Sequence, residues 1–255
     1  MYHLSYLLLT MALLHTVLPA RAETTLSDAA QPVRLLRGTN FYSAVRGARL
    51  QSGDLLETGD GGVQIDIAGI ATLALGPATR VYFKLGAGAP EVQLLDGWLK
   101  VQAAGTNADN APRIASGALA FAVAGGSVTV RHAARKTELF VENGELLVSD
   151  AEAGKTARAV KVLREQYAVR NAAELLKLLP RAPRDFLGGM PPTFLDTLVS
   201  VNSKGVAVAP KLDAAATFSQ VTPWLADAPA LRQTLQRRFY PPPPKKPAPP
   251  SVAHQ

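Results

Sequence analysis

The middle of the chain consists of short runs in which apolar and polar residues alternate, with glycines between the runs. The pattern extends from Gln31 to about Arg170, and Val63–Ile67 (VQIDI) shows it most clearly. A period of two places apolar side chains on one face of a β-strand and polar side chains on the other. The sequence therefore predicts an all-β fold of many short strands, arranged as a sandwich or roll over residues 32–170.

Glycines between the runs indicate where strands turn. Ala68-Gly69 separates Val63–Ile67 from a second apolar run, which predicts a turn. Gly125-Gly126 separates two further strand-like runs, at residues 119–123 and 128–130. Consecutive glycines accept the positive φ angles of tight hairpin turns, so a hairpin is expected there.

Residues 80–85 (RVYFKL) predict a strand with one apolar face and one polar face. Its outward side chains would be available to a partner, and an edge strand can also pair with a partner's backbone. The candidate partner surface on this strand is Arg80, Tyr82 and Lys84.

Two similar segments, Asp96–Val101 (DGWLKV) and Asn143–Val148 (NGELLV), each follow an apolar strand-like run. Two copies do not establish a solenoid, which usually needs three or more repeats. They do support many short strands in one domain. The glycines of these segments are predicted to lie in structural turns, as are two glycines and an aspartate in residues 53–59. The predicted turn residues are Gly53, Asp54, Gly59, Gly97 and Gly144.

The N-terminus has the pattern of an export signal. An apolar run from Leu7 to Leu18 is followed by Pro19 and the small-residue site Ala20-Arg21-Ala22. The run has about 12 residues, fewer than the ~20 of a membrane-spanning helix. We expect residues 1–22 to be a signal peptide cleaved after Ala22, and the mature chain to be periplasmic with no transmembrane span.

Residues 171–240 have a different pattern, and they predict a helical and irregular extension. Ala172–Leu179 resembles a short helix ended by Pro180. Phe186, Met190 and Phe194 then lie among prolines without a regular period, which favours a strap laid over the β domain.

A second helix is expected near the end of the extension, capped by Asp227 and with Pro229 in its first turn. Its apolar face should dock on the domain, although an aromatic and basic patch for a partner is the alternative. The residues of that patch are Trp224, Arg237 and Arg238. The tail at 241–255 is rich in proline and lysine and should be extended and disordered.

Composition excludes several chemistries. The chain has no cysteine, so disulfides and thiolate metal sites are excluded. Of its four histidines only His132 and His254 follow the predicted signal peptide, too few for a histidine metal cluster. His132 is expected to be an ordinary strand-end or surface residue. Gly154-Lys155-Thr156 lacks the earlier glycine of a phosphate-binding loop. We expect no enzyme activity, cofactor or metal.

Four segments in order resemble the FecR-like domain of the Gram-negative cell envelope. They are Leu50–Gly62 (LQSGDLLETGDGG), Leu73–Thr79 (LALGPAT), Leu94–Val101 and Val141–Val148. The resemblance covers roughly residues 32–170 and implies an all-β domain that acts by binding and signalling. In known members this domain is joined through a membrane helix to a cytoplasmic anti-sigma region. No such helix is expected here, so the chain is more similar to stand-alone exported members.

Two functions follow as expectations. The favoured one is a non-enzymatic periplasmic protein that binds an envelope protein partner in signalling or regulation. The alternative is a scaffold that binds peptidoglycan or another anionic polymer. It is motivated by the net charge, which is +7 for the whole chain and +6 without residues 1–22, and by the arginines and lysines near the C-terminal end. Nucleic acid is not expected as a partner, because of the predicted compartment.

Overall fold

The computed structural model describes residues 23–86, 88–105, 107–150, 159–172, 174–200 and 207–242. Strands predominate and helices are few, which confirms the all-β fold with a short helical C-terminal part. The predicted signal peptide, the Gly154-Lys155 turn and nearly all of the tail lie outside the described residues.

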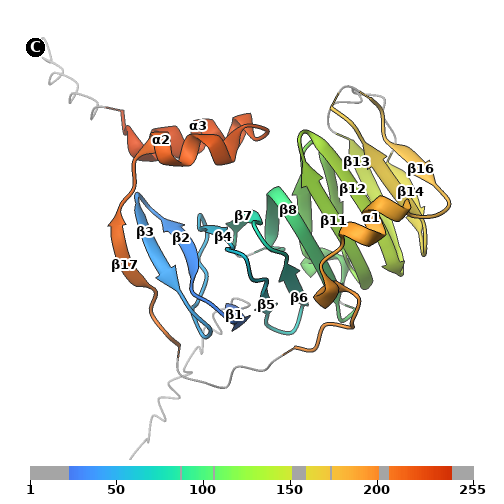
Figure 1. The fold of residues 1–255 in the computed structure, drawn as a ribbon, viewed down its shortest axis with the longest axis horizontal. Helices are drawn as coiled ribbons and strands as arrows, with labels where there is room; N and C mark the ends of the chain where they lie inside the picture. Colours follow the sequence, from blue (N-terminus) through green and yellow to red (C-terminus); the bar gives the residue numbers. More distant parts are fainter. Residues whose placement is uncertain are drawn as a thin grey trace, which may run out of the picture.

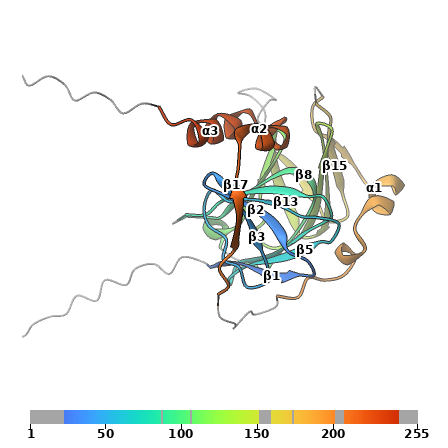
Figure 2. The same ribbon diagram turned by 60° about the vertical axis from the view of Figure 1, so that its left-hand side comes forward.

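The strands form two layers that face each other (Figures 1 and 2). We call the first layer sheet A. Its strands, in spatial order, are β1 (Thr24–Ala29), β5 (Val63–Ile67), β6 (Ala71–Leu75), the second half of β8 (Glu91–Ala103), β11 (Gly126–Ala133), β12 (Lys136–Asn143), β15 (Tyr167–Arg170) and β16 (Lys177–Leu179).

The second layer is sheet B. In spatial order it consists of β17 (Lys211–Ala215), β3 (Asn40–Ala44), β2 (Val33–Arg37), β4 (Leu55–Glu57), β7 (Arg80–Lys84), the first half of β8, β9 (Arg113–Ser116), β10 (Leu119–Ala122), β13 (Glu145–Asp150) and β14 (Val160–Leu163). β1 and β17 lie outside residues 32–170, so the strands extend beyond the predicted domain on both sides.

Strand β8 belongs to both sheets and joins them. Its first half pairs with β7 and β9, and its second half pairs with β6 and β11. Gly97 lies at the change-over with φ of 94°, and a Cβ there would lie 2.4 Å from Oγ1 of Thr79. Only glycine fits this position, because both the backbone angle and the space exclude a side chain.

The main core lies between the two sheets and follows the alternation in the sequence. Inward residues of both layers are buried together, whereas their neighbours along each strand face outward. From sheet A the core includes Leu26, Ile65, Leu73, Leu99, Val128 and Leu139, and from sheet B it includes Leu35, Leu56, Val81, Phe83, Ile114 and Phe121.

The turn predicted at Gly69 is confirmed and joins β5 and β6 as a hairpin, but the hairpin predicted at Gly125-Gly126 is wrong. β10 pairs with β9 and β13, whereas β11 pairs with β8 and β12, so the chain crosses between sheets there. A Cβ on Gly126 would lie 2.1 Å from the Asn143 carbonyl oxygen. The hairpin lies instead between β11 and β12, where Ala134 and Arg135 have φ of 48° and 62°.

The helix predicted over Ala172–Leu179 is also wrong. Lys177–Leu179 form β16, which pairs with β15 at the edge of sheet A. An eight-residue helix ended by Pro180 has too few hydrogen bonds to be stable without packing, whereas β15 offers backbone partners.

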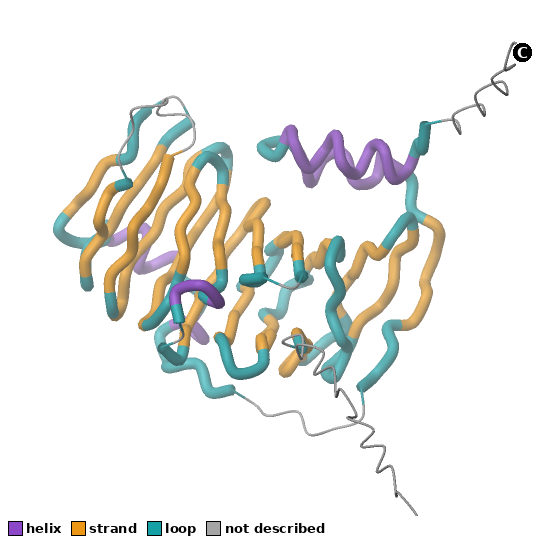
Figure 3. The backbone as a smooth tube through the Cα atoms, turned by 180° about the vertical axis from the view of Figure 1, so that it is seen from behind, coloured by secondary structure: helices purple, strands orange, loops and turns teal. Residues whose placement is uncertain are grey.

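Residues 184–200, which we call the strap, cross the outer face of sheet A as predicted. The strap contains α1 (Arg184–Gly189) and the short helix η2 (Pro192–Phe194), and Figure 3 shows its course from behind. Phe186, Met190 and Phe194 are buried against Trp98 and Tyr167. These aromatic anchors hold an otherwise irregular segment.

Polar side chains of sheet A also bind the backbone of the strap. Gln102 donates to the carbonyl of Leu198 at 2.7 Å and accepts from its N–H at 2.9 Å. The buried Lys100 ammonium donates to the carbonyl of Asp196 at 3.0 Å and lies 2.8 Å from Glu142. The strap is therefore fixed through both its backbone and its side chains.

Residues 218–239, which we call the helical unit, lie on the outer face of sheet B. The unit contains α2 (Phe218–Val221), η3 (Thr222–Leu225) and α3 (Pro229–Phe239). The predicted docking of the apolar face of α3 is confirmed by the burial of Leu231 and Leu235, but Ala228 rather than Asp227 is the N-cap residue. The carboxylate of Asp227 faces His132 and Arg135 instead. None of the described helices has the length and hydropathy that crossing a bilayer requires.

Candidate functional site

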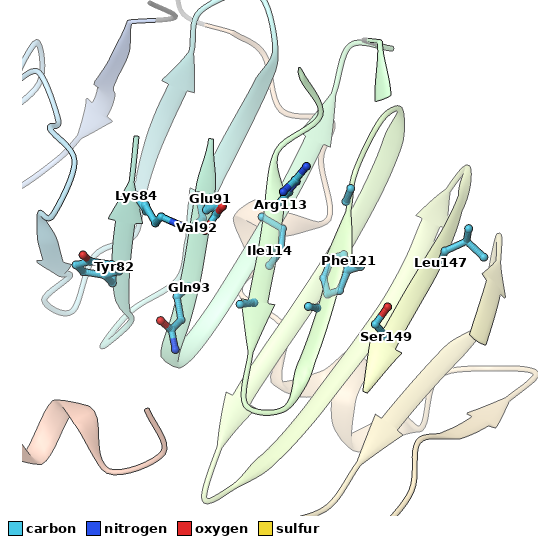
Figure 4. A pocket seen from close by; sticks show the side chains of 13 residues that line it. Tyr82, Lys84, Glu91, Val92, Gln93, Arg113, Ile114, Phe121, Leu147 and Ser149 are labelled. Carbon is cyan, nitrogen blue, oxygen red and sulfur yellow. Dashed lines mark hydrogen bonds and ion pairs between the residues drawn. The ribbon is translucent and has the colours of Figure 1, made fainter. Parts of the chain in front are cut away.

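The candidate site is an open groove of about 500 Å³ on the outer face of sheet B (Figure 4). Five neighbouring strands, β7, β8, β9, β10 and β13, contribute to it. It begins where the helical unit ends, so it occupies the part of this face that the helical unit leaves open. Its lining residues are Tyr82, Lys84, Glu91, Val92, Gln93, Arg113, Ile114, Ala115, Ala120, Phe121, Ala122, Leu147 and Ser149.

The groove follows from the residues that point outward on adjacent strands. Ile114 and Phe121 point inward and are buried in the core, which turns their neighbours toward solvent. Those neighbours include Ala115, Ala120 and Ala122. Because methyl groups reach only a short distance from the sheet, adjacent strands with outward alanines leave a shallow floor.

Larger side chains form the two sides of the groove. Tyr82 lies on one side and also packs against the apolar cluster beneath the helical unit. Leu147 on β13 lies on the other side, and 62% of its surface is exposed. Leu147 thus adds an exposed apolar side chain beside the apolar floor.

Charged groups lie at one end of the groove. Lys84 and Glu91 form an ion pair at 2.9 Å across β7 and β8. Arg113 on β9 is exposed, and no ion pair joins its guanidinium to another described residue. The groove therefore offers an apolar floor with one cation that a partner can neutralise.

The predicted surface of Arg80, Tyr82 and Lys84 lies on β7, but β7 is not an edge strand. It pairs with β4 on one side and β8 on the other, so its backbone is not available to a partner. The edge interpretation is wrong because β8, the next strand in the sequence, covers one side of β7 and the three-residue strand β4 covers the other. Tyr82 and Lys84 line the groove, whereas Arg80 is held by Glu57 at 2.8 Å.

Trp224 and Arg238 hold the helical unit on the domain. Trp224 is buried, its ring lies 5.8 Å from that of Phe41, and the Arg34 guanidinium lies 5.5 Å from it. Arg238 donates to the carbonyl of Gly53 at 3.0 Å. Arg237 is exposed. Docking of the helical unit on sheet B therefore accounts for Trp224 and Arg238. Arg237 is the one residue of the predicted patch that faces solvent.

Gly53, Asp54 and Gly59 lie in the turns that flank β4. Gly53 has φ of 90°, which favours glycine. The buried carboxylate of Asp54 accepts from the Gln51 N–H at 2.7 Å and from Arg37 at 2.9 and 2.7 Å. This hydrogen bonding raises the pKa of the Arg37 guanidinium. The Gly59 carbonyl accepts from the Ala78 N–H at 2.8 Å.

Gly97 and Gly144 both lie where the chain passes from one sheet to the other. Gly97 does so within β8, and Gly144 does so between β12 and β13. Their φ angles are 94° and 87°. The two similar segments of the sequence are therefore similar crossing points.

His132 lies next to the last residue of β11, as expected for a strand-end histidine, but it is buried rather than at the surface. Its Nδ1 lies 2.8 Å from Oγ1 of Thr137, and burial lowers the pKa of its imidazole. Asp227 opposes that shift from 3.6 Å. No group of three or more potential metal-ligating acids and histidines occurs among the described residues.

The alternation of residues in the sequence does not by itself predict the groove. The alternation Ala120-Phe121-Ala122 shows two small outward residues around a core residue, and this was the available signal. It does not show that β13, with Leu147, lies beside β10, because that pairing joins distant parts of the chain.

Comparison with known proteins adds two solved structures. No family model and no curated protein matches the chain. Crystal structures of a proposed anti-sigma factor from Parabacteroides distasonis, at 2.50 and 1.65 Å, are 13% and 12% identical to it. Each match has a TM-score of 0.43 and covers 50% of this chain. The chain thus spans 59% of the length of those proteins.

Proposed function

We propose that this chain is a non-enzymatic FecR-domain protein of the periplasm that binds an envelope protein partner in signalling or regulation. The observation that carries the proposal is the groove on sheet B. It is apolar, open and bounded by an exposed leucine, Leu147, and the chain's own helices cover the adjacent part of the same face. Concave surfaces with a mainly apolar floor and a few polar groups are where proteins most often bind ligands and partners.

The segments that resemble the FecR-like domain support the proposal through their structural roles. In Leu50–Gly62, Asp54 fixes the turn before β4. Thr58 then accepts from the Thr79 N–H at 2.8 Å and donates to the Gly76 carbonyl at 2.7 Å, which joins two of the resembling segments. The residues shared with the family pattern thus build the scaffold that carries the groove.

The periplasmic location rests on the N-terminal sequence alone. Fractionation of cells that express the full chain tests it, together with N-terminal sequencing of the purified product. A mature N-terminus at Glu23, recovered in the periplasmic fraction, is the expected result. An intact N-terminus in the cytoplasmic fraction would contradict the location.

Crosslinking in the native envelope, followed by affinity purification and mass spectrometry, tests the function. The tagged wild-type chain is compared with Leu147→Asp in the groove and with the control Leu212→Asp. Leu212 is a matched control because it is a similarly exposed leucine, 57% against 62%, on β17 outside the groove. Wild type and the control should capture the same discrete protein, and Leu147→Asp should capture much less.

The alternative scaffold function gives a different result. Recovery only with sacculi, and loss of that recovery at high salt, would favour binding to an anionic polymer, because salt screens exposed charges. If a protein partner is captured equally well at low and high salt, the scaffold function is excluded. Recovery of no partner protein under any condition would overturn the proposed function.

A further inference from the structure

We propose that the groove on sheet B binds an amphipathic helix of the partner, laid beside the helical unit. The inference rests on the proposed function and specifies the kind of segment that the groove accepts. Three observations carry it: the neighbouring interface, the pairing of the floor strands, and the charge at one end of the groove.

The groove continues an interface that already holds helices. The helical unit packs its apolar face on outward residues of β2, β3, β4 and β8 of the same sheet. Tyr82 lies at the boundary, since it contacts that cluster and also lines the groove. The sheet residues of this interface are Leu36, Phe41, Leu55 and Leu95, and those of the helical unit include Val221, Trp224, Leu225, Leu231 and Leu235.

The backbone of the floor is mostly used by the sheet, which disfavours an added strand. β7, β8 and β9 pair with a neighbour on both sides, whereas β10 and β13 pair with each other at two positions, Leu119 with Asp150 and Ala120 with Ser149. We therefore expect a partner to bind chiefly through side chains on the face of the sheet rather than through backbone hydrogen bonds at an edge. A helix satisfies its own backbone groups and presents a continuous apolar face, so it meets this requirement.

The dimensions also fit a helix. Strands in a sheet lie about 4.8 Å apart, so β8 to β10 span about 10 Å, which is close to the diameter of an α-helix with its side chains. Ala115, Ala120 and Ala122 keep the β9 and β10 part of this width open, and Gln93 on β8 borders it. The bulkier Tyr82 and Leu147 lie on either side and would contact the flanks of the helix.

The charge at one end sets a further requirement. Because the Arg113 guanidinium has no ion-pair partner among the described residues, a carboxylate on the bound helix would pair with it. The Lys84–Glu91 pair beside it is already neutral. We therefore expect the partner helix to carry an acidic residue at the edge of its apolar face.

Site-specific photo-crosslinking in living cells tests the inference. A benzophenone amino acid replaces Ala122 or Leu147 in the groove, and Leu212 as the control, in the full chain. The crosslinked partner residues are then mapped by mass spectrometry. The expected result is one partner segment, labelled from both groove positions, with labelled residues three, four or seven apart, and no such label from Leu212.

Five results would overturn the helix proposal. Labelled residues spaced by two would indicate an extended strand, and labelled peptides of this chain would indicate a second copy. Labelled sacculus fragments without peptides would indicate a polymer. A protein partner labelled only from Leu212 would place the interface elsewhere, while the proposed function would stand. If no position labels any protein, the proposed function fails as well.

Substitutions at two groove positions test independently whether the partner helix binds in the groove. Ala120→Trp fills the floor from an exposed position, so it should preserve the fold and reduce crosslinking from Leu147 about ten-fold. Arg113→Glu should also reduce it, whereas Arg113→Lys should retain most of it. Crosslinking that is unchanged in Ala120→Trp would exclude the groove as the helix site.

Discussion

The Nε2 atom of His132 lies 3.6 Å from Oδ2 of Asp227, and this contact joins β11 to the residues just before α3. The imidazole is buried, and its Nε2 has no hydrogen-bond partner among the described residues. Arg135 and Arg170 line the same cavity, and Arg170 is held by Asp150 at 2.8 Å. The helical unit is thus anchored beside a histidine whose charge depends on pH.

The first prediction concerns the pH dependence of stability. Burial lowers the pKa of His132 below its ordinary value of 6.5, while Asp227 and Asp96 oppose the shift. The unfolded chain then binds this proton more readily than the folded one. The free energy of unfolding should therefore fall as the pH drops below about 6.5, by at most about 1.4 kcal/mol per pH unit from this group. Urea unfolding at a series of pH values measures it.

Two variants isolate the contribution of His132. His132→Asn can retain a donor to Thr137 but does not titrate, so its stability should depend less on pH. Asp227→Asn removes the carboxylate that opposes the shift, so the loss of stability should extend to lower pH. The same pH dependence in all three proteins would contradict the assignment.

The second prediction concerns the strand that joins the two sheets. Gly97→Ala should lower the free energy of unfolding by about 3 kcal/mol or more, because φ is 94° and the new Cβ would overlap Thr79. Gly69→Ala is the matched control, since its φ is 71° but nothing lies within 4 Å of its Cβ position. Gly69→Ala should lower the free energy of unfolding by about 1 kcal/mol. Equal losses would show that crowding at Gly97 is unimportant.

The third prediction concerns the strap. The Phe186 ring lies 5.1 Å from Trp98 and 5.2 Å from Tyr167, so Phe186→Ala should cost about 3 kcal/mol and expose Trp98. The chain has two tryptophans, so in a Trp224→Phe background the emission reports on Trp98 alone. A red shift is expected. Leu187→Ala, at a position 46% exposed, should leave the emission unchanged.

The alternation in the sequence was sufficient to predict the strands but not the partners of each strand. Val63–Ile67, Arg80–Lys84 and Leu119–Ala122 are strands where the period of two placed them. Whether a run lies in sheet A or sheet B depends on pairings between distant segments, which alternation does not encode. The turn at Ala134-Arg135 was missed for a local reason, because neither residue type favours positive φ.

The candidate site was less accessible to sequence reasoning than the fold. Tyr82 and Lys84 were selected because they point outward, and they do line the groove. Their role in an edge strand was wrong, since β4 and β8 enclose β7. Trp224 was considered both as an anchor and as a contact for partners. Its burial depends on Phe41 and Arg34, which lie far away in the sequence.

The last prediction concerns the ion pair beneath the β4 turn. Asp54 is fully buried, whereas 22% of the Arg37 side chain is exposed, so Asp54→Asn leaves a partly hydrated guanidinium without its carboxylate. We expect a loss of about 2 kcal/mol, less than for a fully buried pair. Asp60→Asn, at an exposed position in the same segment, should cost less than about 0.5 kcal/mol. Urea unfolding compares the two variants, and similar losses would mean that the Arg37–Asp54 pair does not stabilise this turn.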